Sequence, residues 1–228
     1  MYKGFSIVAV IPARGGSKRL PGKNIKKLNG IPLIAHSINQ AKECSYIDGI
    51  FVTTDDDSII NVANQYGVSI IKRPSNLATD FSSTAEAIDH AYKQILLLGF
   101  GPDIILILQP TNPLRPKDLV ESCISEFCNN MSSFDTLITV SENHLKLGKI
   151  STGCFSPLSY QLGQRSQDLD KLYYENGLLY LVKKEVLEGT GNIFGKRIYP
   201  KIINTIHAQV DIDEQIDFEW AEFIINKI

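Results

Sequence analysis

The apolar residues of this chain fall into two kinds of pattern. Residues 7–11 (IVAVI) and 104–108 (IILIL) are short, continuous apolar runs, which are typical of strands buried on both faces of a parallel sheet. After Pro32, by contrast, apolar residues recur at helical spacing through Ile34 and Ile38. The alternation of these two patterns predicts strands separated by amphipathic helices.

The same patterns locate the other elements. Strands are predicted at 50–54, 68–71, 136–140 and 177–182, and helices after Asp56 or Asp57, from Ser83, after Pro116 and over 214–226. Ser83 and Glu86 have the spacing of a capping box, which marks the start of one helix. The order β-α-β-α-β predicts a doubly wound, mainly parallel α/β sheet.

Two parts of the second half are less regular. Residues 141–175 are polar and rich in turn residues, without helical periodicity, and they predict an excursion from the sheet. The closing helix over 214–226 is predicted to bury one apolar side, which contains Ile216, Trp220, Phe223 and Ile224.

Composition limits the class of protein. With 228 residues, of which 43% are hydrophobic, the chain is long enough to bury a core as one domain. Its net charge of −2 argues against general attraction to nucleic acid or membranes, so we expect neither as a partner. No apolar stretch approaches membrane-spanning length and the N-terminus lacks the form of a signal peptide, so a cytoplasmic location is expected. The cysteines and histidines lack disulfide or zinc-ligand spacing.

Candidate chemistry begins directly after the first strand. The segment 11–24 (IPARGGSKRLPGKN) contains two adjacent glycines and four basic residues: Gly15, Gly16, Arg14, Lys18, Arg19 and Lys23. Glycines allow amide N–H groups to face an anion, and the cations supply charge for phosphates. The spacing fits neither the P-loop nor the dinucleotide fingerprint. A solvated surface turn is the simpler reading, but open α/β sheets bind ligands at the carboxyl ends of their strands.

Further polar clusters follow the next strands. Asp55–Asp57 can orient a ribose, a base or a hydrated metal, or they can cap a helix. Arg73 follows the third strand and leads to Asp80, which brings another cation to the same edge. The segment 109–115 (QPTNPLR) follows the central strand, and its two prolines fix the path of a loop. The amide, hydroxyl and guanidinium groups of this loop suit reading a base or positioning a substrate.

Asp211 and Asp213 flank Ile212 near the C-terminus. In an extended segment, alternation places both carboxylates on one face. Two convergent oxygen ligands suit magnesium, which is commonly completed by water and substrate phosphates. An acidic turn that caps the next helix explains the pair equally well by itself. The cationic loop on the same sheet favours the metal site.

In combination, five segments resemble one enzyme family. IPARGGSKRLPGKN, RPSNLATD, LILQPTNPLR, YYENGLLYL and VDID have the order and intervals of the acylneuraminate cytidylyltransferases, or CMP-sialic acid synthetases, over nearly the whole chain. Enzymes that activate legionaminic and pseudaminic acid share much of this pattern, whereas Kdo cytidylyltransferases are more distant. The resemblance implies a Rossmann-like sheet of the nucleotide-diphospho-sugar transferase type. It also implies one cytidylyltransferase domain over 1–228, with a dimerisation or substrate excursion at 141–175.

The resemblance further implies a reaction between CTP and a nine-carbon 2-keto acid sugar, whose C2 hydroxyl attacks the α-phosphate while Mg²⁺ assists the departure of pyrophosphate. Lys23, Arg14 and Asp211 would be catalytic, and Asp211 and Asp213 would bind the metal. As a solvated loop cation, Lys23 is expected to add little to folding. The nucleotide would contact Arg14, Gly15, Gly16, Ser17, Lys18, Lys23, Asn24, Arg73, Asp80, Ser83 and Thr84. The sugar would contact Gln109, Arg165, Glu175 and Asn176, with Arg165 paired to its carboxylate. The general base stays open among Asp211, a metal-bound hydroxide and solvent positioned by Gln109.

Departures from the family pattern bear on the substrate. Asn112 replaces a serine in a change expected to preserve the loop, and Asp170 stands where proline is common. Some sialic acid enzymes carry a basic residue near Glu175, whose carboxylate would instead suit an amine or hydroxyl donor. Legionaminate-type sugars therefore stand beside N-acetylneuraminate. The alternative functions are a CMP-legionaminate, CMP-pseudaminate or CMP-Kdo-type synthetase, a sugar-1-phosphate nucleotidyltransferase and a non-catalytic nucleotide-binding protein.

The resemblance also implies a homodimer in which 141–175 is exchanged with the partner or packs across it. Several apolar residues in or near this segment lack core periodicity, which fits an interface. They could equally fold back onto their own sheet. They are Tyr160, Leu162, Leu172, Tyr173 and Tyr174.

Overall fold

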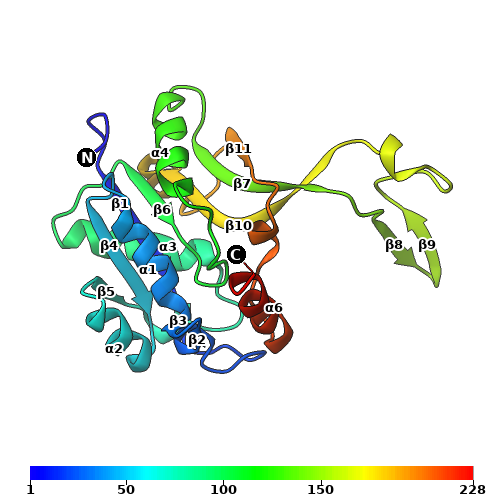
Figure 1. Cartoon of the computed structure of the whole chain (residues 1–228). Helices are drawn as coiled ribbons and strands as arrows, with labels where there is room; N and C mark the ends of the chain where they lie inside the picture. The colour runs from blue at the N-terminus through cyan, green and yellow to red at the C-terminus, as the bar shows by residue number, and fades with distance from the viewer. Residues whose placement is uncertain (228) are drawn as a thin grey trace.

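In the computed structural model, which describes residues 1–227, a seven-stranded sheet forms the centre of the molecule (Figure 1). Its strands lie in the order β11-β7-β10-β6-β1-β4-β5. Only β10 runs antiparallel to its two neighbours; the other neighbouring pairs are parallel, so the predicted mainly parallel sheet is confirmed. The strands are β1 (Ile7–Pro12), β4 (Gly49–Thr54), β5 (Ser69–Lys72), β6 (Ile104–Ile107), β7 (Thr136–Asn143), β10 (Leu172–Lys183) and β11 (Ile198–Ile202).

Helices cover both faces of this sheet, as a doubly wound fold requires. On one face, α1 (Leu33–Glu43), α2 (Asp57–Gln65) and α4 (Leu119–Asn129) pack against Ile7, Ala9 and Leu106. On the other, α3 (Thr84–Leu97) and α5 (Lys184–Thr190) pack against Val8 and Val10. Successive residues of β1 thus face opposite cores, which explains why this strand is a continuous apolar run.

Local signals in the sequence set several helix boundaries. The Ser83 side chain accepts from the Glu86 amide while Glu86 bonds back to Ser83, so the predicted capping box is present at the start of α3. Asp56 caps α2 by accepting from the Ile59 amide, and Gly67 with φ +61° follows its end. Short 3-10 turns occupy Lys23–Ile25, Ser75–Leu77, Ser166–Asp168 and Ile206–Gln209.

The predicted excursion is an arm that projects from the body of the molecule (Figure 1). Strands β7 and β10 continue to pair with each other, from Val140–Asn143 to Leu172–Glu175, and lead the chain outward. Beyond them β8 (Gly148–Ser151) and β9 (Cys154–Pro157) form a two-stranded hairpin. Thr152 and Gly153 turn it with φ of 51° and 79°, the left-handed values that tight hairpin turns need.

The C-terminal helix corrects one prediction. In α6 (Gln215–Ile225) the buried residues are Phe218, Ala221 and Ile224, which pack on Leu20 and on the small hairpin of β2 (Lys27–Leu28) and β3 (Ile31–Pro32). Of the four residues predicted to face inward, only Ile224 does. The exposed three are Ile216, Trp220 and Phe223. Trp220 and Phe223 stack on each other at the surface, with ring centroids 5.5 Å apart.

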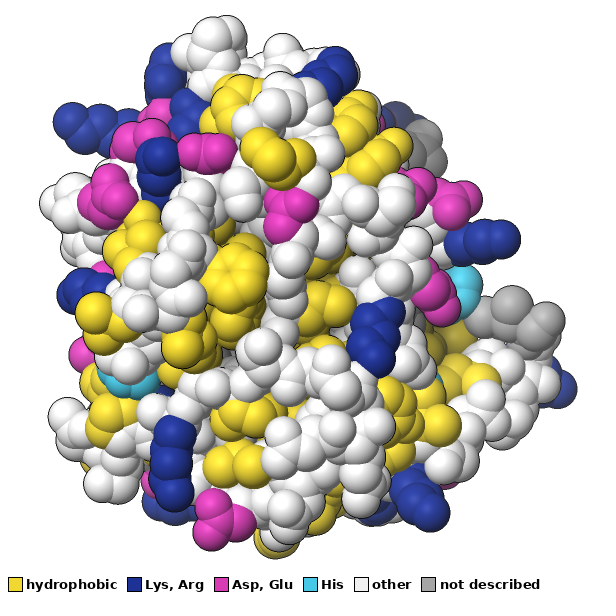
Figure 2. Space-filling view, turned by 90° about the vertical axis from the view of Figure 1, so that its left-hand side faces the viewer, with side chains coloured by type: hydrophobic (Ala, Val, Ile, Leu, Met, Phe, Trp, Pro, Cys, Tyr) yellow, Lys and Arg dark blue, Asp and Glu magenta, His cyan; other side chains and the backbone are white. Residues whose placement is uncertain are grey.

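The surface opposite the arm mixes the two signs of charge. Figure 2 shows Lys and Arg side chains interspersed with Asp and Glu around the periphery of that face, with apolar side chains between them. This distribution agrees with the net charge of −2. None of the helices within residues 1–227 combines the length and apolar character that crossing a lipid bilayer requires.

Strand order determines where a ligand can bind. From β1 the chain passes outward to β4 and β5, and it then crosses to the other side of β1 to form β6. Loops that leave the carboxyl ends of β1 and β6 therefore diverge and open a crevice. The segments 11–24 and 109–115 are these two loops.

Candidate active site

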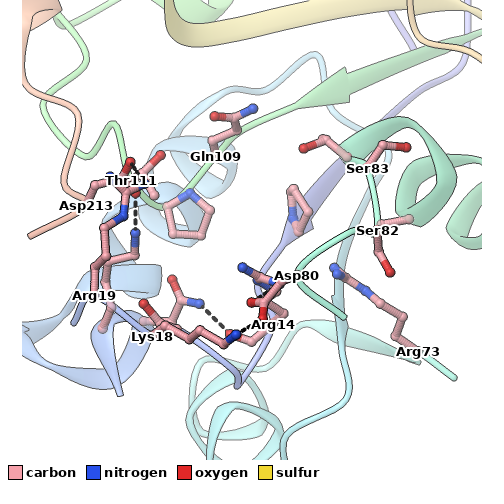
Figure 3. Close-up of a pocket in the computed structure, with 17 residues that line it drawn as sticks. Arg14, Lys18, Arg19, Arg73, Asp80, Ser82, Ser83, Gln109, Thr111 and Asp213 are labelled. Carbon is pink, nitrogen blue, oxygen red and sulfur yellow. Dashed lines mark hydrogen bonds and ion pairs between the residues drawn. The ribbon is translucent and has the colours of Figure 1, made fainter. Parts of the chain in front are cut away.

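A pocket of about 490 Å³ lies in this crevice, a volume typical of small-molecule sites (Figure 3). Its walls come from the loop after β1, the loop after β6, the start of α3 and the segment before α6. The lining residues are Pro12, Arg14, Ser17, Lys18, Arg19, Lys23, Asn24, Arg73, Asp80, Ser82, Ser83, Thr84, Ala87, Gln109, Pro110, Thr111 and Asp213. Most residues predicted to hold the nucleotide are therefore brought together.

The four cations of the first loop are paired with two carboxylates. Asp80 lies 2.5 Å from Lys18 Nζ and 3.2 Å from Arg14 Nη1, and Asp213 lies 2.6 Å from Arg19 Nη2 and 2.9 Å from Lys23 Nζ. Figure 3 shows the two carboxylates at different parts of the pocket wall. The hydrogen bond from Lys18, with the charges of both cations, lowers the pKa of Asp80. A polyanion that enters the pocket would compete with these carboxylates for the cations.

Lys23 is much more buried than a loop lysine was expected to be. Only 8% of the residue is exposed, and its ammonium group donates to the Ile212 carbonyl at 2.6 Å as well as to Asp213. Gly22, with φ +67°, turns the chain so that the Lys23–Ile25 turn can enter the body of the protein. Asn24 is also buried and donates to the Arg14 carbonyl at 2.9 Å. Lys23 is therefore held in a fixed position.

Gly15 lies against the start of α2, and its amide already has a partner. The Gly15 amide donates to Asp55 at 3.0 Å, and a Cβ at Gly15 would lie 2.6 Å from an Asp56 carboxylate oxygen. Gly15 thus permits close approach to the start of α2, and its N–H is occupied. Both Gly15 and Gly16 line an adjoining open hollow beside Phe81 instead of the main pocket. Their assignment to nucleotide binding stays a prediction without support from this geometry.

Arg73 and the start of α3 form another part of the pocket wall. Arg73 is 6% exposed and donates to the Thr53 carbonyl at 2.8 Å, and burial lowers its pKa against the opposing effect of Asp55. Ser83 and Thr84 place the N-terminus of the 14-residue helix α3 at the pocket. The positive end of the helix dipole adds to the field that favours an anion there.

The loop after β6 divides its side chains between pocket and core. Gln109 and Thr111 line the pocket. Arg115, which was predicted to read a base or position a substrate, is instead 7% exposed and turned into the fold. It donates to the carbonyls of Gln109 (2.7 Å) and Leu178 and to the side chains of Ser37 (3.0 Å) and Gln40 (2.8 Å). Because all four acceptors are uncharged, burial lowers the pKa of Arg115 to about 9.

The Asp211–Asp213 segment keeps its predicted alternation, although it is not a strand of the sheet. Ile212 is fully buried, Asp213 lines the pocket, and Asp211 is exposed outside the lining. Partial desolvation raises the pKa of Asp211, and the negative charge of Asp213 raises it further. Partial burial opposes the ionisation of Asp213, but Lys23 and Arg19 outweigh it and lower the pKa of that group.

These carboxylates fit magnesium by their chemistry. Both groups would supply oxygen ligands, and the negative charge of Asp213 raises the pKa of Asp211, a repulsion that a divalent cation would relieve. Among residues 1–227, no group of three His, Cys, Asp or Glu side chains forms a ready-made metal cage. A magnesium ion would therefore need water and phosphate oxygens to complete its coordination.

Three residues predicted to contact the sugar lie outside the pocket of their own chain. Arg165 is on the arm, where it pairs with Asp168 at 2.7 Å. Glu175 accepts from the Tyr180 hydroxyl at 3.3 Å, which leaves Gln109 as the predicted sugar contact that lines the pocket. Asn176 is 5% exposed, and its amide donates to Ser141 while its side-chain oxygen accepts from Leu178. The side-chain amide of Asn176 is buried, connects β10 to β7 and does not face the pocket.

Three polar lining residues, Arg19, Thr111 and Ser82, had not been assigned individually to the nucleotide or the sugar. Arg19 and Thr111 belong to segments that the sequence had already marked as candidate sites. Their neighbouring residues were therefore the signal that could have identified them. Ser82 precedes the capping box, and no sequence feature separates it from an ordinary loop serine.

Comparison with known proteins agrees with this architecture. A family model described as "Cytidylyltransferase" matches residues 8–226. A CMP-N,N'-diacetyllegionaminic acid synthase of Legionella pneumophila is 32% identical over 95% of this chain and 94% of that protein. An N-acylneuraminate cytidylyltransferase of Escherichia coli is 30% identical over 97% of this chain, which spans 52% of the E. coli protein. The solved structure of a CMP:2-keto-3-deoxy-manno-octonic acid synthetase complexed with CTP has the same fold, with a TM-score of 0.72 at 18% identity over 97% of this chain and 99% of that chain.

Proposed function

The chain belongs to the cytidylyltransferase family, and from this premise we propose that it transfers the CMP group of CTP to a nine-carbon 2-keto acid sugar, with release of pyrophosphate. One observation carries the proposal: four cations of a single loop line a pocket at the switch point of the sheet, beside a pair of carboxylates. The sugar hydroxyl is itself the nucleophile, so the protein has to supply position and charge.

We propose that the triphosphate takes the place of Asp80 beside Arg14 and Lys18. Arg14 also donates to the Thr79 carbonyl at 2.6 Å, so its guanidinium is already held toward the pocket. A triphosphate carries several negative charges where Asp80 carries one, and charge-assisted bonds to it would be correspondingly stronger. Asn24, Arg73 and the start of α3 would then enclose the rest of the nucleotide.

Lys23 is the cation proposed to stabilise the leaving pyrophosphate. Its bonds to the Ile212 carbonyl and Asp213 hold the ammonium group before the reaction begins. A preorganised charge needs little rearrangement as negative charge builds on the leaving oxygens, which is why fixed cations favour such a transition state. Arg14 would act beside it on the same phosphates.

Asp211 and Asp213 would hold magnesium together with the phosphates. When bound there, the ion would supply positive charge that polarises the phosphoryl oxygens. For this role Arg19 and Lys23 would have to share Asp213 with the metal or turn toward the triphosphate.

On the acceptor side, Gln109 is the side chain of the proposed sugar set that lines the pocket. Arg165 would reach a sugar only across a dimer, because on its own chain it belongs to the arm. We therefore propose that the whole chain acts as one catalytic domain within a homodimer. The proposed acceptor is an acylneuraminate or a legionaminate-type sugar.

The first experiment measures pyrophosphate release with each of the four common nucleoside triphosphates and Mg²⁺. The acceptor panel contains N-acetylneuraminate, legionaminate, pseudaminate and Kdo. We expect release with CTP and one nine-carbon sugar, and that sugar then identifies the substrate.

Each other outcome has a defined meaning. Preference for another triphosphate would overturn the assignment to CTP. Release only with a sugar 1-phosphate as acceptor would point to a sugar-1-phosphate nucleotidyltransferase. CTP binding without release across the panel would favour a nucleotide-binding protein without this activity.

The Asp211→Asn variant separates the roles of that carboxylate. If Asp211 is a metal ligand, the variant should need about 10–100-fold more Mg²⁺ to reach half of its maximal rate. If Asp211 is instead a base that does not bind metal, the variant should have a lower kcat and an unchanged magnesium requirement. Because Asp211 is exposed, the variant should fold. Wild-type rate and magnesium dependence in Asp211→Asn would contradict both roles.

A further inference from the structure

Asn112 is a buried polar residue at the centre of the loop after β6. It is 1% exposed, and it does not line the pocket. Its side-chain amide donates to the Asn176 carbonyl at 3.0 Å and to the Val210 carbonyl at 3.1 Å. Its side-chain oxygen accepts from the Thr111 hydroxyl at 3.1 Å. One side chain therefore joins its own loop to two separate segments, which contain Asn176 and Val210.

The first contact holds the bend of β10 against the loop. Gly177 has φ +72°, and a Cβ there would lie 2.8 Å from the Asn112 side-chain oxygen. The pairing of β10 with β7 shifts its register between Glu175 and Tyr180, at the same place. The strand thus bends where Asn112 meets it, and only a glycine leaves enough room.

The second contact fixes the segment that carries the two carboxylates. Next to the bond from Asn112 to the Val210 carbonyl, the Ile212 amide donates to the Thr111 carbonyl at 2.8 Å. These adjacent bonds align residues 210–212 with residues 111–112. Asp213 follows immediately and lines the pocket together with Thr111 and Gln109.

We propose that Asn112 is a positioning residue that sets the place of the Asp211–Asp213 carboxylates relative to Gln109. The inference rests on the proposed function for its catalytic consequence, because those carboxylates are the proposed magnesium ligands and Gln109 the proposed sugar contact. Groups behind a metal ligand orient it and change metal affinity without touching the ion.

The chemistry of the side chain explains why asparagine stands here. Two carbonyls from different segments need two N–H donors at fixed directions, and a primary amide has them. Serine has a single hydroxyl hydrogen on a shorter side chain, so it can donate to only one carbonyl at a time. Asparagine therefore makes a connection that serine cannot make.

The test compares Asn112→Ser with Ile95→Val, a substitution in the fully buried core between α3 and the sheet. Ile95→Val controls for a general loss of stability, because it touches neither loop. Hydrogen exchange of the Ile212 amide is measured in the free protein, relative to the Leu106 amide in β6. The magnesium requirement, kcat and the KM for CTP are measured with the accepted sugar.

For Asn112→Ser we expect exchange at Ile212 to accelerate by about tenfold relative to Leu106, as for the loss of one well-formed hydrogen bond. The Mg²⁺ concentration for half-maximal rate should rise about tenfold. The KM for CTP should stay within about twofold, because the phosphate-binding cations do not contact Asn112. Ile95→Val should leave the exchange rate of Ile212 relative to Leu106, the magnesium requirement and the KM for CTP at their wild-type values.

A lower melting temperature in Asn112→Ser with wild-type exchange at Ile212 and a wild-type magnesium requirement would overturn the inference, since Asn112 would then be a packing residue only. If the serine variant does not fold, Asn112→Thr, which is closer in volume and keeps one donor, is judged by the same two readouts. A wild-type protein without CTP turnover would refute the proposed function, whereas exchange at Ile212 would still decide whether Asn112 holds the carboxylate segment.

Discussion

At the scale of single side chains, the first loop contains two different kinds of lysine. The Lys18 side chain is 80% exposed, and its partner Asp80 is also accessible to solvent. The Lys23 side chain is 9% exposed and bonded to a carbonyl and a carboxylate. From sequence, Lys23 was expected to be a solvated cation that adds little to folding. The structure corrects this, because a buried ammonium group with two partners contributes to stability.

The Lys23→Ala variant should lose both activity and stability. We expect pyrophosphate release to fall by about 10²–10³-fold, as for other lost charge-stabilising groups. The free energy of unfolding should fall by about 1.5–3 kcal/mol, because hydrogen bonds of a charged group are lost in a buried place. Urea denaturation and pyrophosphate release measure the two effects.

Lys18→Ala is the matched control for that change. It removes the same charge from the same loop, but at an exposed position, so its effect on unfolding should stay within about 0.5 kcal/mol. Equal urea midpoints for the two alanine variants would show that the burial of Lys23 does not stabilise the fold.

At the scale of elements, helix starts were easier to predict than helix faces. The capping box of α3 involves residues three positions apart, so the sequence contains the whole motif. The inward face of α6 depends on what lies beneath the helix. Leu20 and Leu28 come from a distant part of the chain and pack against Phe218, Ala221 and Ile224. The aromatic side chains of Trp220 and Phe223 therefore remain at the surface.

Asp135 joins two elements and should make stability depend on pH. Its carboxylate accepts from Arg197 Nη2 at 2.8 Å and from the Arg197 amide at 3.1 Å, which ties the chain before β11 to the start of β7. The side-chain bond from Arg197, supported by the amide and nearby charges, lowers the pKa of Asp135. Its contribution is therefore fully present above the unfolded-state pKa of about 3.9 and is lost as the pH falls through the lower folded-state value.

The Asp135→Asn variant tests this dependence. At pH 7 it should unfold at a lower urea concentration than the wild type, because the charge-assisted bonds are lost. The difference between the two proteins should shrink as the pH falls below about 4, where the wild-type carboxylate also becomes neutral. A difference that is constant from pH 7 to pH 3 would contradict the assigned pKa shift.

At the scale of the whole molecule, the arm exposes apolar side chains that the rest of its own chain does not cover. Four of the five apolar residues expected at an interface are at least 40% exposed, namely Leu162, Leu172, Tyr173 and Tyr174, as are Ile150 and Phe155 on the hairpin. Tyr160 is partly buried. Large exposed apolar surfaces commonly mark interfaces between proteins. This exposure supports the proposed homodimer and explains how Arg165 could serve a site other than that of its own chain.

The double variant Ile150→Ser, Phe155→Ser should weaken the dimer while the body remains folded. Sedimentation velocity should show the wild type at twice the chain mass and the variant shifted toward a single chain, since loss of apolar area weakens association. Leu97→Ser, which changes a 79% exposed leucine at the end of α3, is the control and should sediment as the wild type does. A dimer that persists unchanged in the double variant would place the interface elsewhere.

The sequence by itself determined most strands of the central sheet and the helices between them, the class of the sheet and the basic loop at the end of β1. These features follow from local apolar periodicity and from the rule that ligands meet the carboxyl ends of parallel strands. The edge strand β11, the helix α5 and the small hairpins were not predicted. Tertiary structure alone decided that Lys23 and Asn112 are buried, that Arg115 turns inward and that Arg165 of the arm lies outside the pocket of its own chain. The Lys23–Asp213 bond joins residues 190 positions apart, and Asn112 meets Val210 across 98. Such contacts arise only when the folded sheet brings distant loops together, so no local pattern contains them.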